Sequence, residues 1–349
     1  MYSVVRSILF QLSAETAHEL TLESLAAGAR LGLLPALAPK VPNLPVTVMG
    51  IEFPNPVGLA AGLDKNGSAI DGLAALGFGF LEVGTTTPKP QAGSPKPRLF
   101  RLPKANAMIN RMGFNNKGVD HLVENVKKAK FKGVLGINIG KNFDTPISDA
   151  ALDYVICMQK VYAHATYITV NISSPNTQGL RDLQYGESLR QLLAALKREQ
   201  ALLTKIHGRY VPLAVKVSPD MDDEQLQDLA RCVLEQEMDA VIATNTTLSR
   251  DGVADLEFAN EAGGLSGAPV KEKSTQTIAD LYAILGEQVP IIGVGGIDSG
   301  QSAFDKIMAG STAIQLYTGM VYKGPGIVKD IKKELIEILK KEKIKNIQQ

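Results

Sequence analysis

The stretch of the sequence whose residue types are best suited to chemistry is Asn171-Ile-Ser-Ser-Pro-Asn176, which follows the short apolar run Tyr167–Val170. Its two asparagines carry amides that both donate and accept hydrogen bonds, and Ser174 carries a hydroxyl group. Pro175 restricts the backbone and favours a turn. In α/β barrels and doubly wound sheets, ligands bind where parallel strands end. The stretch therefore fits a catalytic or binding loop, and an ordinary turn rich in Ser, Pro and Asn is the competing interpretation.

Gly, Thr, Asn and Lys also recur after seven other predicted strands. These strand ends are Ala61–Lys65, Gly84–Pro88, Gly140–Asn142 (with Asn138 inside the strand), Lys216–Pro219, Thr244–Thr247, Gly293–Asp298 and Tyr317–Gly319. A loop that only closes the chain needs such residues once or twice, whereas a barrel enzyme carries its active site on this rim. The repetition favours a ligand site over an ordinary turn.

Two of these ends have the composition of a phosphate site. The pair Gly295-Gly296 leaves backbone N–H groups open to an anion, because no side chain stands in the way. The facing stretch Tyr317-Thr-Gly319 supplies further amides, and barrels often bind phosphate between their last two loops. The stretch Gly263–Gly267 is a candidate for the same wall. A tight turn between a strand and a helix is the alternative explanation of the glycine pair.

Two predicted connections are longer than a compact domain needs. Residues 84–115 and 171–187 exceed about 12–15 residues, a length at which loops are usually functional, often as lids. Four prolines in the first connection (Pro88, Pro90, Pro95 and Pro97) argue against simple disorder. Both connections are therefore predicted to border the site.

The elements that must position these residues alternate regularly. Apolar runs predict strands at Val57–Ala60, Phe78–Val83, Val134–Ile139, Tyr167–Val170, Leu213–Val217, Ala240–Ala243, Ile291–Val294 and Ala313–Leu316. Amphipathic patterns predict helices at about 66–76, 116–129, 148–164, 187–206, 223–236, 272–285, 300–309 and 326–341. Eight strands, each followed by a helix, predict an α/β fold of the (β/α)8 TIM barrel type. Continuously apolar strands fit a parallel sheet covered by helices.

The first 40 residues differ from the barrel and predict a short N-terminal two-helix extension. One face of the first helix is marked by Val4, Val5, Ile8, Leu9 and Leu12. Ser13 is the expected N-cap of a second helix, which Pro35 should end. An apolar run, Leu31–Leu37, follows. These helices could pack on the barrel, lie on a bilayer surface or form an apolar entrance.

A hairpin is expected at Val46–Met49 and Ile51–Phe53, around Gly50. The predicted organisation is thus an extension over residues 1–40, a barrel over 41–341 and a polar tail over 342–349.

Composition excludes several classes of protein. The formal net charge of +1 gives no field suited to nucleic acid. Cys157 and Cys232 match no metal-ligand spacing, so we expect reduced core thiols, a cytoplasmic protein and no metal site. No run approaches the roughly 18 apolar residues of a membrane span, and the N-terminus does not resemble a secretory signal.

The motifs together resemble the dihydroorotate dehydrogenase family, from about residue 1 to residue 330. The resemblance rests on Gly62–Lys65, Asn110–Asn115, Asn171–Asn176, Thr244–Thr247, Gly263–Gly267 and Gly293–Ile297, in that order. Ser174 stands where the soluble class of the family has cysteine, and the N-terminal extension is present. Both features are typical of the quinone-dependent, membrane-associated class, and the absence of a transmembrane helix is typical of its bacterial members.

The resemblance implies an FMN-dependent oxidoreductase of pyrimidine biosynthesis. Such an enzyme oxidises (S)-dihydroorotate to orotate, passing a hydride to FMN and then electrons to a membrane quinone. It is expected to lie peripherally on the cytoplasmic face of the cell inner membrane. Ser174 would be the base that removes the C5 proton. Lys216 would face the negative charge that grows on the reduced flavin.

The resemblance also implies two sets of binding residues. Substrate would be held by Lys65, Asn110, Arg111, Met112, Gly113, Phe114, Asn171, Asn176, Asn245 and Thr246. FMN would be held by Ala61, Gly62, Leu63, Asp64, Lys65, Thr85, Asn138, Asn171, Lys216, Thr244, Gly267, Gly296, Tyr317 and Thr318. The amides can pair with a planar imide, and Lys65 can neutralise a carboxylate.

A serine hydroxyl is a poor base at neutral pH, so the proton must leave Ser174 by a relay, for which Thr177 and water are candidates. Two other functions compete with this one. Another FMN barrel would favour a histidine base or iron–sulfur cysteines, but His18, His121, His164 and His207 all fall in helical stretches. A non-catalytic barrel that binds a phosphorylated ligand would purify without flavin.

Overall fold

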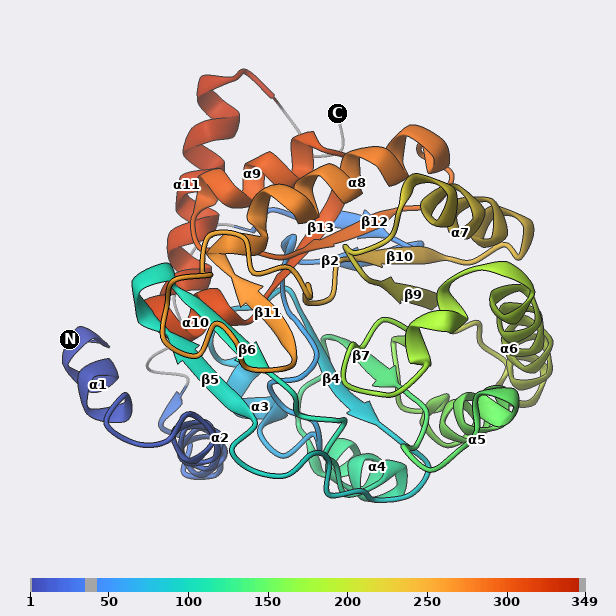
Figure 1. Ribbon diagram of the computed structural model, residues 1–349, viewed down its shortest axis with the longest axis horizontal. Helices are drawn as coiled ribbons and strands as arrows, with labels where there is room; N and C mark the ends of the chain where they lie inside the picture. The colour runs from blue at the N-terminus through green and yellow to red at the C-terminus, as the bar shows by residue number, and fades with distance from the viewer. Residues whose placement is uncertain (1, 35–42, 345–349) are drawn as a thin grey trace.

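The computed structural model describes residues 2–34 and 43–344, and its centre is a closed barrel of eight parallel strands (Figure 1). The barrel strands are β3 (Val57–Leu59), β4 (Phe80–Thr86), β7 (Val134–Ile139), β8 (Tyr167–Asn171), β9 (Leu213–Val217), β10 (Ala240–Ala243), β12 (Ile291–Val294) and β13 (Ser311–Leu316). Pairing of β13 with β3, with Leu316 opposite Leu59, closes the ring. The predicted (β/α)8 barrel is confirmed, because continuous apolar runs are what a strand buried on both faces requires.

Helices cover the outside of the barrel, as the sequence pattern predicts. They are α3 (Ile70–Ala74), α4 (Val119–Lys128), α5 (Ala150–Val161), α6 (Gly186–His207), α7 (Asp223–Glu235), α8 (Lys271–Leu285), α9 (Gly300–Met308) and α11 (Ile327–Lys341). The expected helix over 66–76 is much shorter, because the Asp64 carboxylate accepts the N–H groups of Ser68 and Ala69 and holds the preceding residues in a turn. A further helix, α10 (Thr318–Lys323), was not predicted.

Aromatic rings fill the barrel interior where neighbouring strands carry glycine. A Cβ on Gly58 would lie 2.3 Å from the ring of Phe80, and one on Gly136 would lie 2.2 Å from the ring of Tyr167. The glycines therefore leave the space that the rings occupy, and any larger side chain there would overpack the interior.

A small antiparallel sheet lies over the rim of the barrel and was not predicted. It joins β5 (Leu99–Leu102), β6 (Ala107–Asn110) and β11 (Gly264–Gly267), with β6 in the middle (Figure 1). Phe100, Ile109 and Leu265 belong to its own apolar core. The long connection 84–115 is thus mostly an ordered wall above the barrel, not a free lid.

The N-terminal extension has the two predicted helices, α1 (Tyr2–Leu9) and α2 (Ala14–Arg30). Ser13 is the N-cap of α2, accepting the N–H of Thr16 at 3.2 Å, as predicted. The first helix ends at Leu9, so Leu12 lies in the following turn. Residues 35–42 and 345–349 lie outside the described residues, as therefore do Pro35, the end of the run Leu31–Leu37 and most of the polar tail.

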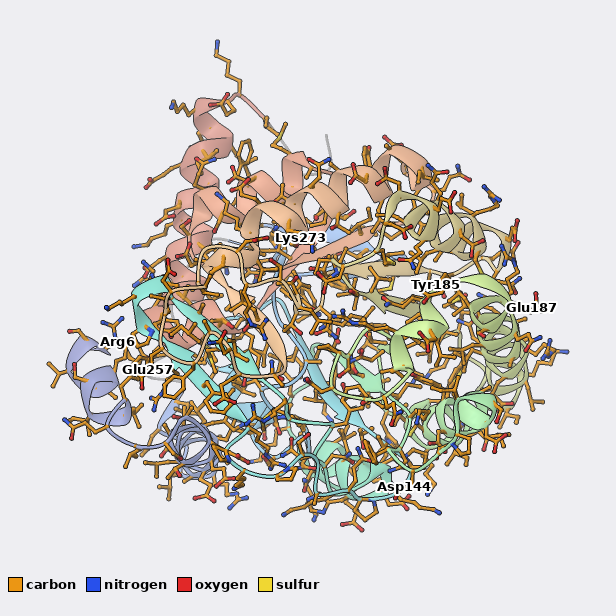
Figure 2. All side chains as sticks on the ribbon, in the orientation of Figure 1. Arg6, Asp144, Tyr185, Glu187, Glu257 and Lys273 are labelled. Atoms are coloured by element: carbon orange, nitrogen blue, oxygen red, sulfur yellow. The ribbon has the colours of Figure 1, made fainter. Side chains whose placement is uncertain are left out.

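The extension is docked on the barrel through polar and close backbone contacts. Glu15 of α2 and Arg98 form a buried ion pair at 2.7 Å. A Cβ on Gly72 of α3 would lie 2.7 Å from the carbonyl oxygen of Leu25, so glycine lets α2 approach closely. Figure 2 shows Arg6 on α1 at one side of the barrel, and Tyr185 and Glu187 at the start of α6 on the opposite side.

The expected hairpin is confirmed as β1 (Val46–Val48) paired antiparallel with β2 (Ile51–Phe53). Gly50 in its turn has φ +72°, a conformation that favours glycine. Cys157 and Cys232 are buried and unpaired, as expected. No described helix is long and apolar enough to cross a membrane.

Candidate active site

A partly open cavity lies at the C-terminal rim, between the barrel and the small sheet. Its lining includes residues from the ends of β3, β4, β8, β9, β10, β12 and β13 and from the sheet above. The ligand site predicted from the polar strand ends therefore has a matching cavity. Most of the predicted site residues line it: Ala61, Gly62, Lys65, Thr85, Asn110, Met112, Gly113, Phe114, Asn171, Ser174, Asn176, Lys216, Thr244, Asn245, Thr246, Gly267, Gly296, Tyr317 and Thr318.

Four predicted site residues do not line the cavity. Arg111 instead binds Glu261 at 2.6 Å and lies over the ring of Phe100. Asp64 turns away to hold the backbone before α3, and Leu63 packs in the core. Asn138 is fully buried beneath the lining. Spacing along a motif cannot show which neighbouring side chain turns inward, and the structure places these four behind the wall.

Asparagine side chains in the cavity are fixed by their neighbours. The Asn176 amide donates to the carbonyl oxygen of Asn110 at 3.1 Å, and the Asn245 amide donates to the hydroxyl of Ser173 at 3.0 Å. The Asn171 amide donates to the Thr85 hydroxyl at 3.0 Å. Amides held in this way present their remaining donors and acceptors in set directions, which suits a planar ligand with N–H and C=O groups on its edge.

Ser174 is 5 % exposed and lies at the cavity wall. Its hydroxyl oxygen accepts the N–H of Asn176 at 3.3 Å, which closes the turn that Pro175 favours. Within the described part of the chain, no histidine lines the cavity. Thr177, the candidate relay residue, is buried three positions further along.

Two lysines bring positive charge to the cavity. Lys65 donates to the carbonyl oxygen of Gly62 at 2.9 Å. Burial lowers the pKa of Lys65 to about 8, with a smaller lowering from Arg98, while Glu15 and Asp64 raise it. Burial also lowers the pKa of Lys216, while Glu82 raises it. A negative group bound in the cavity would raise the pKa of both lysines and favour their charged forms.

A polar cluster inside the barrel supports the cavity floor. The buried Glu82 carboxylate accepts hydrogen bonds from Asn138 at 2.8 Å, Tyr167 at 3.0 Å and Gln315 at 2.8 Å. The side-chain oxygen of Gln315 is buried without a donor among the described residues, and Gln315 lines the cavity. Such an acceptor is costly unless a ligand satisfies it. Sequence reasoning missed Gln315 and Glu82, although a polar residue inside an apolar strand run was a usable signal.

The glycine pair after β12 lines the cavity, where a phosphate site is predicted, and it also packs closely against α8. A Cβ on Gly296 would lie 2.5 Å from the Cβ of Lys271, and one on Gly295 would lie 2.9 Å from Ser274. Both φ angles are positive. The glycines therefore let this loop approach the start of α8, and an added side chain would clash with Lys271 or Ser274.

The N-terminal extension reaches the same cavity from outside. Tyr322 lines the cavity and was not predicted as a site residue. Its ring packs edge-on against the ring of Phe10, with 5.6 Å between the ring centroids. Its carbonyl oxygen accepts a hydrogen bond from the Arg6 guanidinium at 2.8 Å. The pKa of His18 is lowered to about 3, mainly by burial and to a smaller extent by the charge of Lys65, while Glu15 opposes this shift. The α1 helix thus contacts a residue of the cavity wall, and His18 of α2 lies close enough to Lys65 for their charges to interact.

Comparison with known proteins identifies the family. The family model described as dihydroorotate dehydrogenase matches residues 43–339. The chain belongs to the dihydroorotate dehydrogenase family.

Among described residues 2–34 and 43–344, no group of three or more His, Cys, Asp or Glu side chains is placed to hold a metal ion.

Curated relatives of this family share most of the sequence. Those named dihydroorotate dehydrogenase (quinone) from Azotobacter vinelandii and Pseudomonas fluorescens are each 62 % identical over 330 residues. The match covers 95 % of this chain and 95 % and 97 % of the two relatives. The predicted family, the oxidoreductase class and the quinone class are therefore confirmed.

Solved structures of the family share the fold. A crystal structure of the dihydroorotate dehydrogenase of Eimeria tenella in complex with ferulenol has a TM-score of 0.89 and 39 % identity, covering 98 % of this chain and 97 % of that one. The ligand-free form has a TM-score of 0.86 and 40 % identity, covering 95 % and 97 %. The barrel and its N-terminal helices are thus a family architecture.

Proposed function

We propose that this dihydroorotate dehydrogenase oxidises (S)-dihydroorotate to orotate for pyrimidine biosynthesis, with FMN as the hydride acceptor, Ser174 as the base and a membrane quinone as the final oxidant. The observation that carries the proposal is the meeting of Ser174, an asparagine cluster and two lysines in one cavity.

The residues present fit FMN. Gln315 offers a buried, unpaired acceptor, and Lys216 offers a positive charge at the cavity floor. The loops after β12 and β13 bring Gly296, Tyr317 and Thr318 to the cavity wall, where backbone N–H groups suit a phosphate. Bound there, FMN would supply a two-electron acceptor for a hydride. Lys216 would stabilise negative charge that develops beside it.

The asparagine cluster and Lys65 would bind and orient the substrate. Amide groups of Asn110, Asn176 and Asn245 match the alternating N–H and C=O groups of a dihydropyrimidine ring. At neutral pH, Lys65 with a pKa of about 8 is mostly charged and suited to a carboxylate. Substrate held in one orientation gains from proximity, which in well-oriented reactions contributes several kcal/mol.

Ser174 would remove the C5 proton. A buried hydroxyl has the position of a base but not the pKa of one, so the proton must pass onward as it is taken. We propose that Thr177, buried three residues away, and water carry it from the cavity. No histidine lines the cavity among the described residues, so the proposed relay uses hydroxyl groups and water.

The extension would give a quinone its route and the protein its place on the membrane. The extension exposes apolar side chains, with Val4 64 % and Ile8 60 % exposed on α1, and Leu31 72 % and Leu33 60 % exposed just after α2. It also contacts Tyr322 and approaches Lys65 at the cavity wall. A lipid-soluble oxidant could therefore pass from a bilayer to the cavity without crossing water, with the protein held peripherally at the cytoplasmic face of the inner membrane.

A direct assay tests the proposal. The purified protein should be yellow, carry about one FMN per chain and reduce a quinone only when dihydroorotate is present. Protein that is colourless and takes up no flavin would support the rival function, a non-catalytic barrel for phosphorylated ligands. Flavoprotein that ignores dihydroorotate but accepts another hydride donor would point to a different FMN oxidoreductase.

A further inference from the structure

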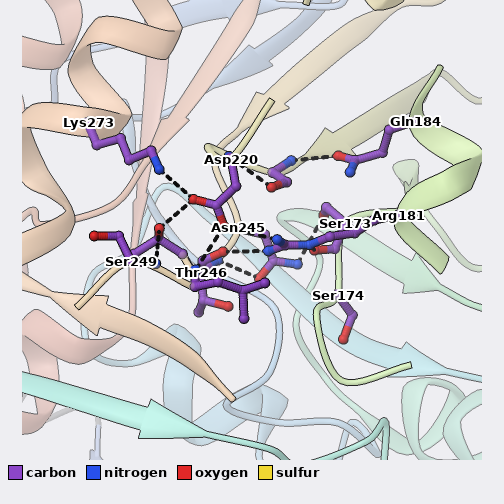
Figure 3. Close-up of polar contacts among 12 residues, drawn as sticks. Ser173, Ser174, Arg181, Gln184, Asp220, Asn245, Thr246, Ser249 and Lys273 are labelled. Atoms are coloured by element: carbon purple, nitrogen blue, oxygen red, sulfur yellow. Dashed lines mark hydrogen bonds and ion pairs between the residues drawn. The ribbon is translucent and has the colours of Figure 1, made fainter. Parts of the chain in front are cut away.

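A charged cluster just outside the cavity ties together the loops that carry the proposed chemistry. At its centre is Asp220, in the loop after β9 (Figure 3). Its carboxylate binds Arg181 at 2.9 Å and Lys273 of α8 at 2.6 Å, and it accepts the N–H of Leu248 at 2.8 Å. The Thr247 hydroxyl donates to it as well. None of these residues lines the cavity.

Arg181 extends the cluster to the backbone of two active-site loops. Its Nε donates to the carbonyl oxygen of Ser173 at 3.1 Å, and its second terminal nitrogen donates to the carbonyl oxygen of Thr246 at 3.0 Å. Ser173 directly precedes Ser174, and Thr246 lines the cavity. One guanidinium therefore joins the loop after β8 to the loop after β10. The planar, fixed fork of arginine suits this role, and a lysine could not reproduce it.

Ser173 is held from the cavity side as well. Its N–H and hydroxyl both donate to the Asn171 side-chain oxygen, at 3.3 and 3.2 Å, and its hydroxyl accepts from Asn245 at 3.0 Å. Arg181 holds its carbonyl oxygen from the opposite side. In Figure 3 the Ser174 side chain points away from this cluster. The position of Ser174 is thus set by the residue before it.

The ion pair of Arg181 and Asp220, here called the clamp, is largely shielded from water. The side chains of Arg181 and Asp220 are 19 % and 15 % exposed, so salt screens the pair less than a surface ion pair. Burial opposes ionisation of Asp220, yet hydrogen bonds from Lys273, Thr247, the Leu248 N–H and Arg181 keep its pKa below the usual value. The carboxylate therefore stays charged throughout the neutral range.

We propose that Arg181 and Asp220 are positioning residues that hold the Ser174 loop in register with the Asn245–Thr246 loop. In this register, Ser174 and the Asn245 side-chain amide face the same substrate ring. This inference rests on the proposed function. Because a misplacement of about 1 Å can slow a reaction about 100-fold, the clamp should influence the proton-abstraction step more than binding.

The test compares the clamp with a similar ion pair away from the cavity. Arg190 of α6 and Asp228 of α7 are 33 % and 26 % exposed and do not line the cavity. For the flavin-loaded Arg181→Met protein we expect flavin reduction in stopped flow to slow by about 10- to 100-fold. Orotate affinity should change less than about three-fold, and reoxidation by quinone should stay normal. Arg190→Met should reduce its flavin at the wild-type rate.

Two further variants separate positioning from mere stability. Asp220→Asn removes the centre of the clamp and leaves Arg181 in place, so it serves if Arg181→Met does not fold; its flavin reduction should also slow. In a double-mutant cycle, Arg181→Met should have little further effect once Ser174 is alanine, because it acts through Ser174. Equal and additive losses in both backgrounds would overturn the proposal.

The outcomes also distinguish this inference from the proposed function. If Ser174→Ala is slow while Arg181→Met and Asp220→Asn reduce their flavin at the wild-type rate, the clamp is only structural and the function stands. If Ser174→Ala is itself unaffected, the base assignment fails, and the clamp proposal fails with it.

Discussion

The charge of Lys65 should affect the affinity for orotate. Burial lowers its pKa to about 8, so it is charged at pH 7 and neutral well above pH 8. If it pairs with the orotate carboxylate, the dissociation constant should be flat below pH 7 and rise by up to about ten-fold per unit above pH 8. Burying the charged Lys65 also opposes folding. The free energy of unfolding should therefore increase as pH rises from about 8 to the pKa of lysine in the unfolded chain.

Flavin-fluorescence titrations with orotate between pH 6 and pH 9.5 measure this effect. Lys65→Met is the control, because its weaker binding keeps only the titration of the ligand itself. Parallel pH curves for wild type and Lys65→Met would mean that Lys65 does not meet the carboxylate.

Glu82 is the residue whose loss should be felt in both stability and flavin binding. Its carboxylate only accepts, and three donors point at it. Glu82→Gln places an N–H₂ group among these donors and leaves at least one of them unpaired in the barrel interior. We expect the free energy of unfolding to fall by about 1–3 kcal/mol, with weaker FMN binding because Asn138 and Gln315 lose their anchor.

Urea unfolding and flavin titration check this prediction, with the exposed Glu52→Gln of β2 as the matched control. Unchanged stability and flavin affinity in Glu82→Gln would show that the cluster is not needed to hold the cavity floor.

At the scale of elements, the sequence was informative where local pattern decides structure. Barrel strands such as β7 and β9 are continuous buried runs, and α7 is preceded by the N-cap Asp222, whose side chain accepts the N–H of Gln225. The small sheet was missed because its pairing is tertiary: Asn110 of β6 pairs with Gly264 of β11, far along the chain. The six-residue α10 is too short for a periodic signal.

The N-terminal extension should be needed for reoxidation of the flavin by quinone but not for its reduction by dihydroorotate. Deleting residues 1–40 removes the helices beside Tyr322 and leaves the barrel and its cavity floor in place. We expect FMN to stay bound and dihydroorotate to reduce it normally, while reoxidation by a long-chain quinone collapses. Each half-reaction is followed separately in stopped flow, with a water-soluble acceptor as the control. Full turnover of long-chain quinone by the truncated, folded protein would contradict this assignment.

The exposed face of α1 should control attachment to lipid. Ile8 is 60 % exposed, and the charges of the extension are balanced, so binding should depend on apolar burial. Ile8→Glu should weaken co-sedimentation with neutral phospholipid vesicles about ten-fold or more, since burying such a side chain contributes about 1.5–3 kcal/mol. Ile206→Glu on α6, at 64 % exposure, is the matched control. Equal vesicle binding by both variants would rule out α1 as the anchor.

At the scale of the whole molecule, the barrel brings residues from distant parts of the sequence to one rim, and this is why the site could be predicted at all. Strand-end composition indicated the rim, and resemblance to the family supplied the individual residues. The inward turn of Tyr322 and the outward turn of Arg111 could not be predicted, because neighbouring helices and loops decide them. The clamp around Asp220 is likewise visible only in three dimensions.

The central claim is that Ser174 removes a proton while the flavin in this cavity is reduced. The most direct measurement is the rate at which dihydroorotate reduces bound flavin in anaerobic stopped flow for Ser174→Ala at neutral pH, with the exposed Ser148→Ala as control. For Ser174→Ala we expect normal FMN content and orotate binding, and a rate about two to four orders of magnitude below wild type. A rate close to that of the wild type and of Ser148→Ala would contradict it.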